Sequence, residues 1–250
     1  MTTDAMAAEF GDVADWTADA VEQLGAGHAI PAACRGSASP AALAWLAEAC
    51  ELAPGQTLLD AGAGVGGPAA WAAERFGVRP ILVEPMISAC RAADRLFGLP
   101  VVAADGGHLP LRSGTADVGW CLGVLCTVED KKAVLDELHR VLKPGASLGL
   151  LVVVARTARQ LPAPDGNHFP TQRELAGVLA DAGFDLLEQI ECRNTAPLSW
   201  SRRADQVAAA VAAKHQTDKA YALAAHQTER MDRLRAARQV SLQLLHAVAA

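Results

Sequence analysis

The sequence predicts an α/β fold: a doubly wound, seven-stranded, mostly parallel sheet of the Rossmann-like type. From residue 55 onward, short β-rich segments alternate with segments of helical pattern, which is typical of a parallel sheet covered by helices on both faces. A glycine-rich stretch follows the first strand, at the position where such sheets bind ligands. The length of 250 residues is near the upper limit for one hydrophobic core. We therefore expect a helical lid region over 1–54 and a main domain over 55–250, with a helical insertion at about 193–239.

The expected strands are short apolar segments bounded by turn residues. The fifth of them, Leu148 to Ala155, is almost continuously apolar, which predicts burial on both faces of the sheet. The last segment is predicted as a seventh strand, although its leucines and alanines would also suit a terminal helix. The seven segments are 57–60, 81–84, 101–104, 116–121, 148–155, 184–190 and 240–248.

Helix signals fill the intervals between these strands. Ser39 followed by Pro40 predicts a helix start, and Thr171 is expected to cap another helix. In the insertion, 215–218 (His-Gln-Thr-Asp) recurs 11 residues later as 226–229 (His-Gln-Thr-Glu). On one helix both copies would face the same way, as an exposed face or, less expected, a substrate-facing stripe. The clearest helices are 12–24, 40–50, 130–142 and 172–182, with two more ending near Phe76 and Phe97.

Composition excludes several classes of function. The net charge of −6 and the isoelectric point near 5.6 argue against nucleic acid as a partner. The longest strongly apolar stretch is far shorter than the roughly 20 residues of a membrane helix, so we expect no membrane association. Six cysteines without a C-x-x-C pair are expected to be reduced thiols. The protein is therefore predicted to be cytoplasmic.

The strongest functional signal is the glycine-rich stretch Leu58 to Gly67, where a buried strand leads into a helix. Gly62, Gly64 and Gly67 satisfy G-x-G-x-x-G, a pattern that does not distinguish a dinucleotide from other adenosine ligands. Asp60 lies two residues before the first glycine. Its carboxylate would repel a pyrophosphate but would attract a ligand with ammonium and sulfonium charges.

Two further acids follow the next strands. Glu84 ends the second strand, from which a carboxylate can accept the hydroxyl protons of a ribose. Asp105 follows the third strand and could accept from an adenine amino group, while Met86 offers adenine an apolar face. Together with Asp60, these residues describe a pocket for an unphosphorylated adenosine that carries a cationic tail.

With these motifs, the sequence resembles the class I S-adenosylmethionine-dependent methyltransferases of the small-molecule type. The resemblance covers most of residues 55 to 192. Ala146 departs from the family pattern, because many relatives carry a second glycine there. The motifs that carry the resemblance are Leu58 to Gly67, Val83 to Met86, Ala104 to Gly106 with Leu109 to Leu111, Ala116 to Val118, and Leu138 to Gly145.

The resemblance implies S-adenosylmethionine as the cofactor and assigns residues to its parts. It also implies that the N-terminal region and the inserted helices form a lid over the site. Arg35 in that region is a candidate partner for the carboxylate of the cofactor. The implied contacts are Asp60, Gly62 and Gly64 at the methionine part, Glu84 at the ribose, Met86, Asp105 and Gly106 at the adenine, and the backbone of Cys121 and Leu122 near the methionine. Ala61 and Pro85 are further expected cofactor contacts.

Methyl transfer from a sulfonium is an in-line displacement, so the enzyme mainly positions the reactants in a dry site. The end of the fourth strand carries no acidic metal ligand, which favours a metal-independent reaction. His28, His108 and His168 are the candidate bases, and His168 is preferred because loops at that edge of a sheet line the ligand crevice. Four aromatic residues outside the sheet could line the acceptor pocket: Phe10, Trp16, Phe169 and Trp200.

Three functions remain open from the sequence. The first is methyl transfer to a small acceptor, such as a natural-product intermediate. The second is an NAD-dependent oxidoreductase, but the Tyr-x-x-x-Lys of short-chain dehydrogenases is absent, since Tyr221 is followed four residues later by Ala225. The third is a non-catalytic S-adenosylmethionine-binding protein, which would share every cofactor residue. The acceptor, the methylated atom and the oligomeric state are not predicted.

Overall fold

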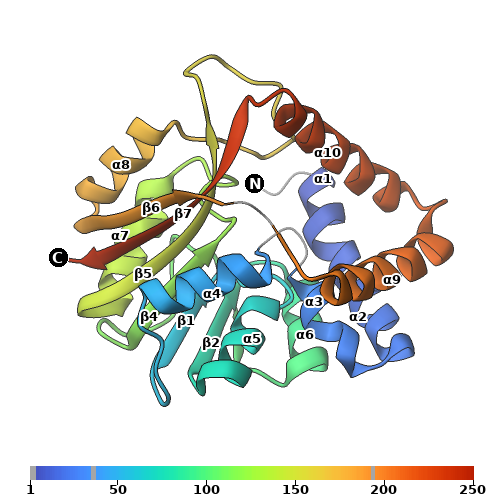
Figure 1. Ribbon diagram of the computed structural model, residues 1–250, viewed down its shortest axis with the longest axis horizontal. Helices are drawn as coiled ribbons and strands as arrows, with labels where there is room; N and C mark the ends of the chain where they lie inside the picture. The colour runs from blue at the N-terminus through green and yellow to red at the C-terminus, as the bar shows by residue number, and fades with distance from the viewer. Residues whose placement is uncertain (1–3, 35–37, 193–194) are drawn as a thin grey trace.

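The protein, described by a computed structural model over residues 4–34, 38–192 and 195–250, is built on a seven-stranded sheet (Figure 1). The strand order is β3-β2-β1-β4-β5-β7-β6, with β7 antiparallel to both of its neighbours and the other pairs parallel. The predicted fold class is confirmed. The strands are β1 (Thr57–Ala61), β2 (Arg79–Glu84), β3 (Val101–Ala103), β4 (Ala116–Leu122), β5 (Leu142–Ala155), β6 (Phe184–Glu191) and β7 (Val240–Ala249).

Helices connect the strands and form the N-terminal region. Ser39 accepts a hydrogen bond from the Ala42 amide, and Thr171 forms a capping box with Glu174, so both predicted helix starts are confirmed. In the described ranges no helix is both long and apolar enough to span a membrane. The helices are α1 (Asp4–Met6), α2 (Val13–Leu24), α3 (Ala29–Ala33), α4 (Pro40–Ala49), α5 (Gly67–Phe76), α6 (Ile87–Phe97), α7 (Lys131–Val141), α8 (Gln172–Asp181), α9 (Leu198–His215) and α10 (Lys219–Ala236), with a π-helix at Ala7–Asp12 and a 3-10 turn at Ala26–His28.

Each face of the sheet is covered by its own set of helices. Helices α4 and α5 pack on one face, where Trp120 of β4 is fully buried. Helices α7 and α8 pack on the other face together with the end of α10, which contributes Leu234. Strand β5 contributes buried residues to both faces, as its apolar sequence predicts. Since α4 packs on the sheet, only α1 to α3 of the N-terminal region are free to cover the ligand-binding edge.

Two local features differ from expectation. Strand β5 begins at Leu142 rather than Leu148, because Leu142 already pairs with Ala116 before a register shift leads to the pairing of Ser147 with Val118. The repeated motif of the insertion does not lie on one helix face, because α9 ends at His215 and a break precedes α10. The closing segment is strand β7, which confirms the preferred assignment.

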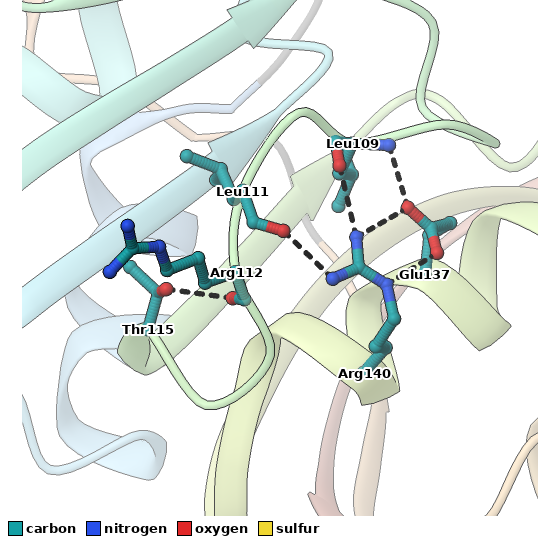
Figure 2. A network of polar contacts seen from close by, with 6 residues as sticks. All are labelled: Leu109, Leu111, Arg112, Thr115, Glu137 and Arg140. Atoms are coloured by element: carbon teal, nitrogen blue, oxygen red, sulfur yellow. Dashed lines mark hydrogen bonds and ion pairs between the residues drawn. The ribbon is translucent and has the colours of Figure 1, made fainter.

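The loop between β3 and β4 is fixed to α7 by an ion pair that also binds backbone groups (Figure 2). The Arg140 guanidinium donates to both carboxylate oxygens of Glu137 at 2.7 Å. It also donates to the carbonyl oxygens of Leu109, at 2.9 Å, and Leu111, at 2.7 Å, while Glu137 accepts from the Leu109 amide. This contact holds the pKa of Glu137 below its ordinary value. The loop that carries Asp105 is therefore anchored close to its middle.

Replacing Arg140 by lysine should destabilise the protein. A lysine keeps the charge but lacks the planar fork that reaches one carboxylate and two carbonyls together. We expect the free energy of unfolding to fall by about 1–3 kcal/mol, measured by urea denaturation. Arg112→Lys in the same loop is the control, since this side chain has no polar partner among the described residues. Equal losses in both variants would contradict the role of the Arg140 network.

Candidate active site

The backbone amides of the glycine-rich turn are already hydrogen-bonded within the protein. The Gly62 and Ala63 amides both donate to the Val83 carbonyl oxygen of β2, at 2.7 and 3.1 Å. The Gly64 amide donates to the Glu84 carboxylate at 2.9 Å. A turn that binds a pyrophosphate needs such amides free to point at the phosphates. These three amides are therefore not available to a pyrophosphate, in agreement with the charge argument from the sequence.

Asp60, at the end of β1, is a buried carboxylate with an unsatisfied oxygen. Its side chain is 1% exposed, and Oδ2 has no hydrogen-bond partner among the described residues. Burial, and then the nearby charge of Glu84, raise the pKa of Asp60 to about 7. Burial raises the pKa of the Cys34 and Cys121 thiols, and the nearby Asp60 charge raises it further, so both thiols stay protonated. A cation bound beside Asp60 would relieve this cost.

Glu84 is held in one orientation at the end of β2. One carboxylate oxygen accepts from the Gly64 amide and the other from the Met86 amide, both at 2.9 Å. Each oxygen keeps a second lone pair that can accept a further proton, such as that of a ribose hydroxyl. Burial raises the pKa of Glu84 and the two amide hydrogen bonds lower it, with a net rise. The carboxylate is thus preorganised to accept hydrogen bonds from a ligand.

The remaining predicted cofactor residues lie at the same edge of the sheet. Strands β3, β2, β1 and β4 are neighbours, and their carboxyl ends meet where parallel strands end together. Asp105 is exposed and uses one oxygen to accept from the Gly107 amide, which leaves the other free. Met86 packs against α2 and the π-helix, and Cys121 and Leu122 are buried at the end of β4. Gly106 packs on α7, Pro85 is exposed, and Arg35 lies outside the described residues.

The N-terminal region closely approaches the glycine-rich turn. A Cβ atom at Gly67, the first residue of α5, would lie 2.7 Å from the Cys34 backbone nitrogen, so only glycine fits. Gly64 has a φ of 54° and open space where a Cβ would point, which leaves room for a ligand beside the Glu84 carboxylate. The segment α3–Cys34 therefore covers the start of α5 directly.

His168 lies in the loop after β5, next to the loop after β4. Its backbone amide donates to the Cys126 carbonyl oxygen at 2.7 Å, and its imidazole is exposed. Of the two other candidate histidines, His28 forms a hydrogen bond with the Gln206 side chain of α9 at 3.0 Å, and His108 is exposed. The structure thus places His168 at the ligand-binding edge, where its role as a base stays a prediction.

A polar cluster that the sequence did not indicate anchors the loop bearing His168 to α10. Gln227 is 2% exposed; its Oε1 accepts from the Asp165 amide at 2.8 Å and its Nε2 donates to the Asp165 carboxylate at 3.3 Å. Arg230 donates to the same carboxylate at 2.7 Å and to the Ala163 carbonyl. Gly166 lies directly under the Met6 side chain. The loop after β5 therefore joins the N-terminal segment to the insertion.

Other contacts near the site also depend on tertiary structure. Val124, just after β4, packs directly on Gly62 of the glycine-rich turn.

The four aromatic residues expected to line an acceptor pocket do not gather in one place. Trp16 stacks on His215 with ring centroids 4.2 Å apart, Phe169 packs on the α7 face, and Trp200 packs on the α4 face. Of the four, only Phe169 lies with the apolar cluster that includes Val124.

Comparisons with known proteins agree with this geometry. Residues 59–150 match the family described as "Methyltransferase domain". Methyltransferase GfsG of Streptomyces halstedii is 31% identical over 168 residues, which cover 57% of this chain and 58% of that protein. The ubiquinone/menaquinone biosynthesis C-methyltransferase UbiE of Acidiphilium cryptum is 31% identical over 180 residues, which cover 56% of this chain and 70% of that protein. The chain belongs to the class I S-adenosylmethionine-dependent methyltransferases.

The methyltransferase fold extends over nearly the whole chain. The crystal structure of the cyclase SpnF matches with a TM-score of 0.72 and 23% identity, covering 97% of this chain and 95% of that one. This match shows the fold, whereas the sequence relatives above confirm the predicted family, whose methyl donor is the expected cofactor S-adenosylmethionine. The chain spans only about half the length of some curated relatives, for example 49% of 24-methylenesterol C-methyltransferase 2 of Oryza sativa subsp. japonica.

The residues of this methyltransferase fit an adenosine cofactor with a cationic tail. The unsatisfied oxygen of Asp60 suits an ammonium or sulfonium charge, and the free lone pairs of Glu84 suit a ribose. The open side of Gly64 leaves space between them. These residues would therefore hold S-adenosylmethionine at the carboxyl ends of β1 and β2.

Asp60→Asn should change ligand affinity and protein stability in opposite directions. Without the carboxylate, S-adenosylmethionine should bind about 1–3 kcal/mol more weakly in calorimetry at pH 8. The pKa of Asp60 is raised to about 7, so the folded state holds a proton that the unfolded state releases, and wild-type stability falls as pH rises from about 4 to 7. The ligand-free variant should consequently be more stable than wild type at pH 8, by about 2–4 kcal/mol.

Wild-type affinity should also depend on pH. Because a cationic ligand prefers the ionised carboxylate, binding should weaken as pH falls below about 7 in the wild type and stay flat in Asp60→Asn. Asp94→Asn, an exposed position on α6, is the matched control for both measurements. Parallel pH profiles in wild type and Asp60→Asn would count against a cation beside Asp60.

Gln227→Ala should release the loop that carries His168. The buried amide makes two hydrogen bonds to Asp165, and their loss leaves the Asp165 carboxylate with the Arg230 contact. Amide hydrogen exchange over 160–168 should accelerate by about tenfold or more, while the β5 amides keep their protection. Gln216→Ala, in the exposed break between α9 and α10, should leave this exchange unchanged. If exchange is unchanged in Gln227→Ala, the Gln227 hydrogen bonds do not hold this loop in place.

Proposed function

We propose that this protein transfers a methyl group from S-adenosylmethionine to a small, largely apolar acceptor. The observation that carries the proposal is the buried Asp60 carboxylate with its unsatisfied oxygen, beside the oriented carboxylate of Glu84. S-adenosylmethionine supplies an activated methyl group on a positively charged sulfur. Asp60 would hold its cationic end, Glu84 its ribose, and Met86, Asp105 and Gly106 its adenine. Ala61, Pro85, Cys121, Leu122 and Arg35 stay as proposed neighbours of the cofactor.

Apolar side chains beside the cofactor edge support an apolar acceptor. They come from three segments that follow or cover the strand ends: the loop after β4, the loop after β5, and α10. All pack in or against one hydrophobic cluster, which would exclude water from the reacting atoms. An acceptor such as a natural-product intermediate fits this surface better than a highly charged compound does. The partly buried side chains are Val124, Val128, Leu161, Phe169 and Met231, which pack against the buried Leu125 and Leu234.

Proton removal is needed only for acceptors whose nucleophilic atom carries a proton. His168 is the proposed general base, supported by its loop lying next to the loop after β4. The residues at the end of β4 are apolar or thiols with raised pKa, so the proposed reaction is independent of a metal ion. A cytoplasmic location, without nucleic-acid or membrane partners, completes the proposal and is supported by the six unpaired thiols.

The direct test is the formation of S-adenosylhomocysteine. The full chain would be incubated with S-adenosylmethionine and a panel of apolar acceptors, with and without an ionisable hydroxyl, and products followed by mass spectrometry. Methylated acceptor together with S-adenosylhomocysteine supports the proposal. Binding of S-adenosylmethionine without turnover would favour the non-catalytic alternative. Binding of NAD in its place would support the oxidoreductase.

Glu84→Gln should weaken S-adenosylmethionine binding by about tenfold or more. The glutamine amide offers one acceptor oxygen instead of two, and its NH2 group would face a backbone amide of Gly64 or Met86. Glu74→Gln, at an exposed position on α5, makes the same chemical change away from the site. Calorimetry should separate the two variants, and equal affinities would argue against a ribose at Glu84.

A further inference from the structure

Two adjoining polar hollows lie where β5 and β6 end and β7 begins. Their volumes are about 630 and 490 Å³. They share Arg156 and Glu191, whose ion pair of 2.6 Å stands between them. None of the lining residues is a proposed cofactor residue. The first hollow is lined by 154–156, 171–173, Gln189, Glu191, Ser241 and Gln243, and the second by Arg156, Glu191, Arg235, Arg238 and Val240.

Positive charge dominates these hollows in a protein whose net charge is −6. Four arginines line them, against one carboxylate, Glu191, among the described lining residues. Within the described chain, the guanidinium groups of Arg173 and Arg238 make no hydrogen bond or ion pair. Arg235 contacts only Asp232, at 3.5 Å on the exposed surface of α10, which is a weak pairing. Three of the four guanidinium groups are therefore available to a ligand.

The floor of the first hollow consists of buried polar side chains. The Gln189 side-chain amide donates to Oε1 of Gln243 at 3.1 Å. Nε2 of Gln243 donates in turn to the Ser241 hydroxyl oxygen at 3.0 Å. Gln243 is 6% and Ser241 8% exposed. Because the Ser241 oxygen accepts from Gln243, its hydroxyl proton stays available to a ligand in the hollow that Ser241 lines. The first turn of α8 also lines this hollow. Its Thr171 and Glu174 amides are used by the capping box, so the Gln172 and Arg173 amides are the donors that it can add.

We propose that these hollows bind the phosphoryl group of a small soluble compound, at a site separate from the methyl-transfer centre. Guanidinium forks match phosphate oxygens in geometry, and a phosphoryl dianion uses several donors at once. Four arginines against Glu191 and the Asp232 that pairs with Arg235 leave two positive charges, more than a single carboxylate would neutralise. The polar lining does not fit the apolar acceptor proposed for the catalytic edge, and the adenosine cofactor carries no phosphate.

Calorimetric titration of the full chain with inorganic pyrophosphate tests the site. Saturable binding is expected, weakened about tenfold or more by the pair Arg173→Gln and Arg238→Gln. The pair Arg202→Gln and Arg203→Gln removes the same charge from exposed positions on α9 and should leave the affinity unchanged. Ser241→Ala should weaken binding severalfold without changing the net charge. Asp60→Asn should have no effect on pyrophosphate affinity, which separates this site from the cofactor site.

Several outcomes would overturn the proposal. Equal weakening by the two arginine pairs would mean that only overall charge attracts the anion. Competition between pyrophosphate and S-adenosylhomocysteine would place the anion at the cofactor edge instead. Citrate that binds as tightly as pyrophosphate would show no preference for a phosphoryl group. Association with phosphatidate vesicles in the absence of pyrophosphate binding would point to a lipid surface rather than a soluble compound.

Discussion

The site depends on two carboxylates buried side by side at the ends of adjacent strands. Removing a charge from water is costly, and like charges in proximity add to that cost, so the Asp60 pKa rises to about 7. The protein compensates Glu84 with two backbone amides but leaves one Asp60 oxygen without a partner among the described residues. A fold selected for stability alone would not retain such a group. A cation from outside the chain, as proposed for the methyl donor, would compensate this oxygen.

The glycine-rich turn reflects the same constraint. In a pyrophosphate-binding turn the backbone amides remain free for the ligand, whereas here the Gly62 and Ala63 amides are used by the Val83 carbonyl and the Gly64 amide by Glu84. The turn therefore orients a carboxylate rather than binding an anion. The G-x-G-x-x-G pattern is thus compatible with either an anionic or a cationic ligand, and the hydrogen bonds of the turn amides favour the cationic one here.

Local sequence predicted most of the fold and the cofactor edge because both follow short-range rules. The signals are local: each depends on residues a few positions apart. They are the strand and helix periodicity, the Ser39 and Thr171 caps, and the acids at strand ends. What it did not predict depends on distant contacts. The break after His215 separates two copies of a motif that looks continuous, and Gln227, predicted to be exposed, is buried against Asp165. The early start of β5 likewise depends on pairing with Ala116 in β4.

The cofactor edge and the acceptor region have different origins in the chain. The family match over 59–150 includes β1 to β4 and part of β5, which carry Asp60 and Glu84. Of the elements that would contact an acceptor, the loop after β4 lies inside this match. The N-terminal segment, the loop at 156–170 and α10 lie outside it and meet at Gly166 and Asp165. Similarity to named methyltransferases therefore informs the donor half of the reaction. The acceptor must be deduced from how these three segments pack together, because their contacts set the shape of the space beside the methyl group.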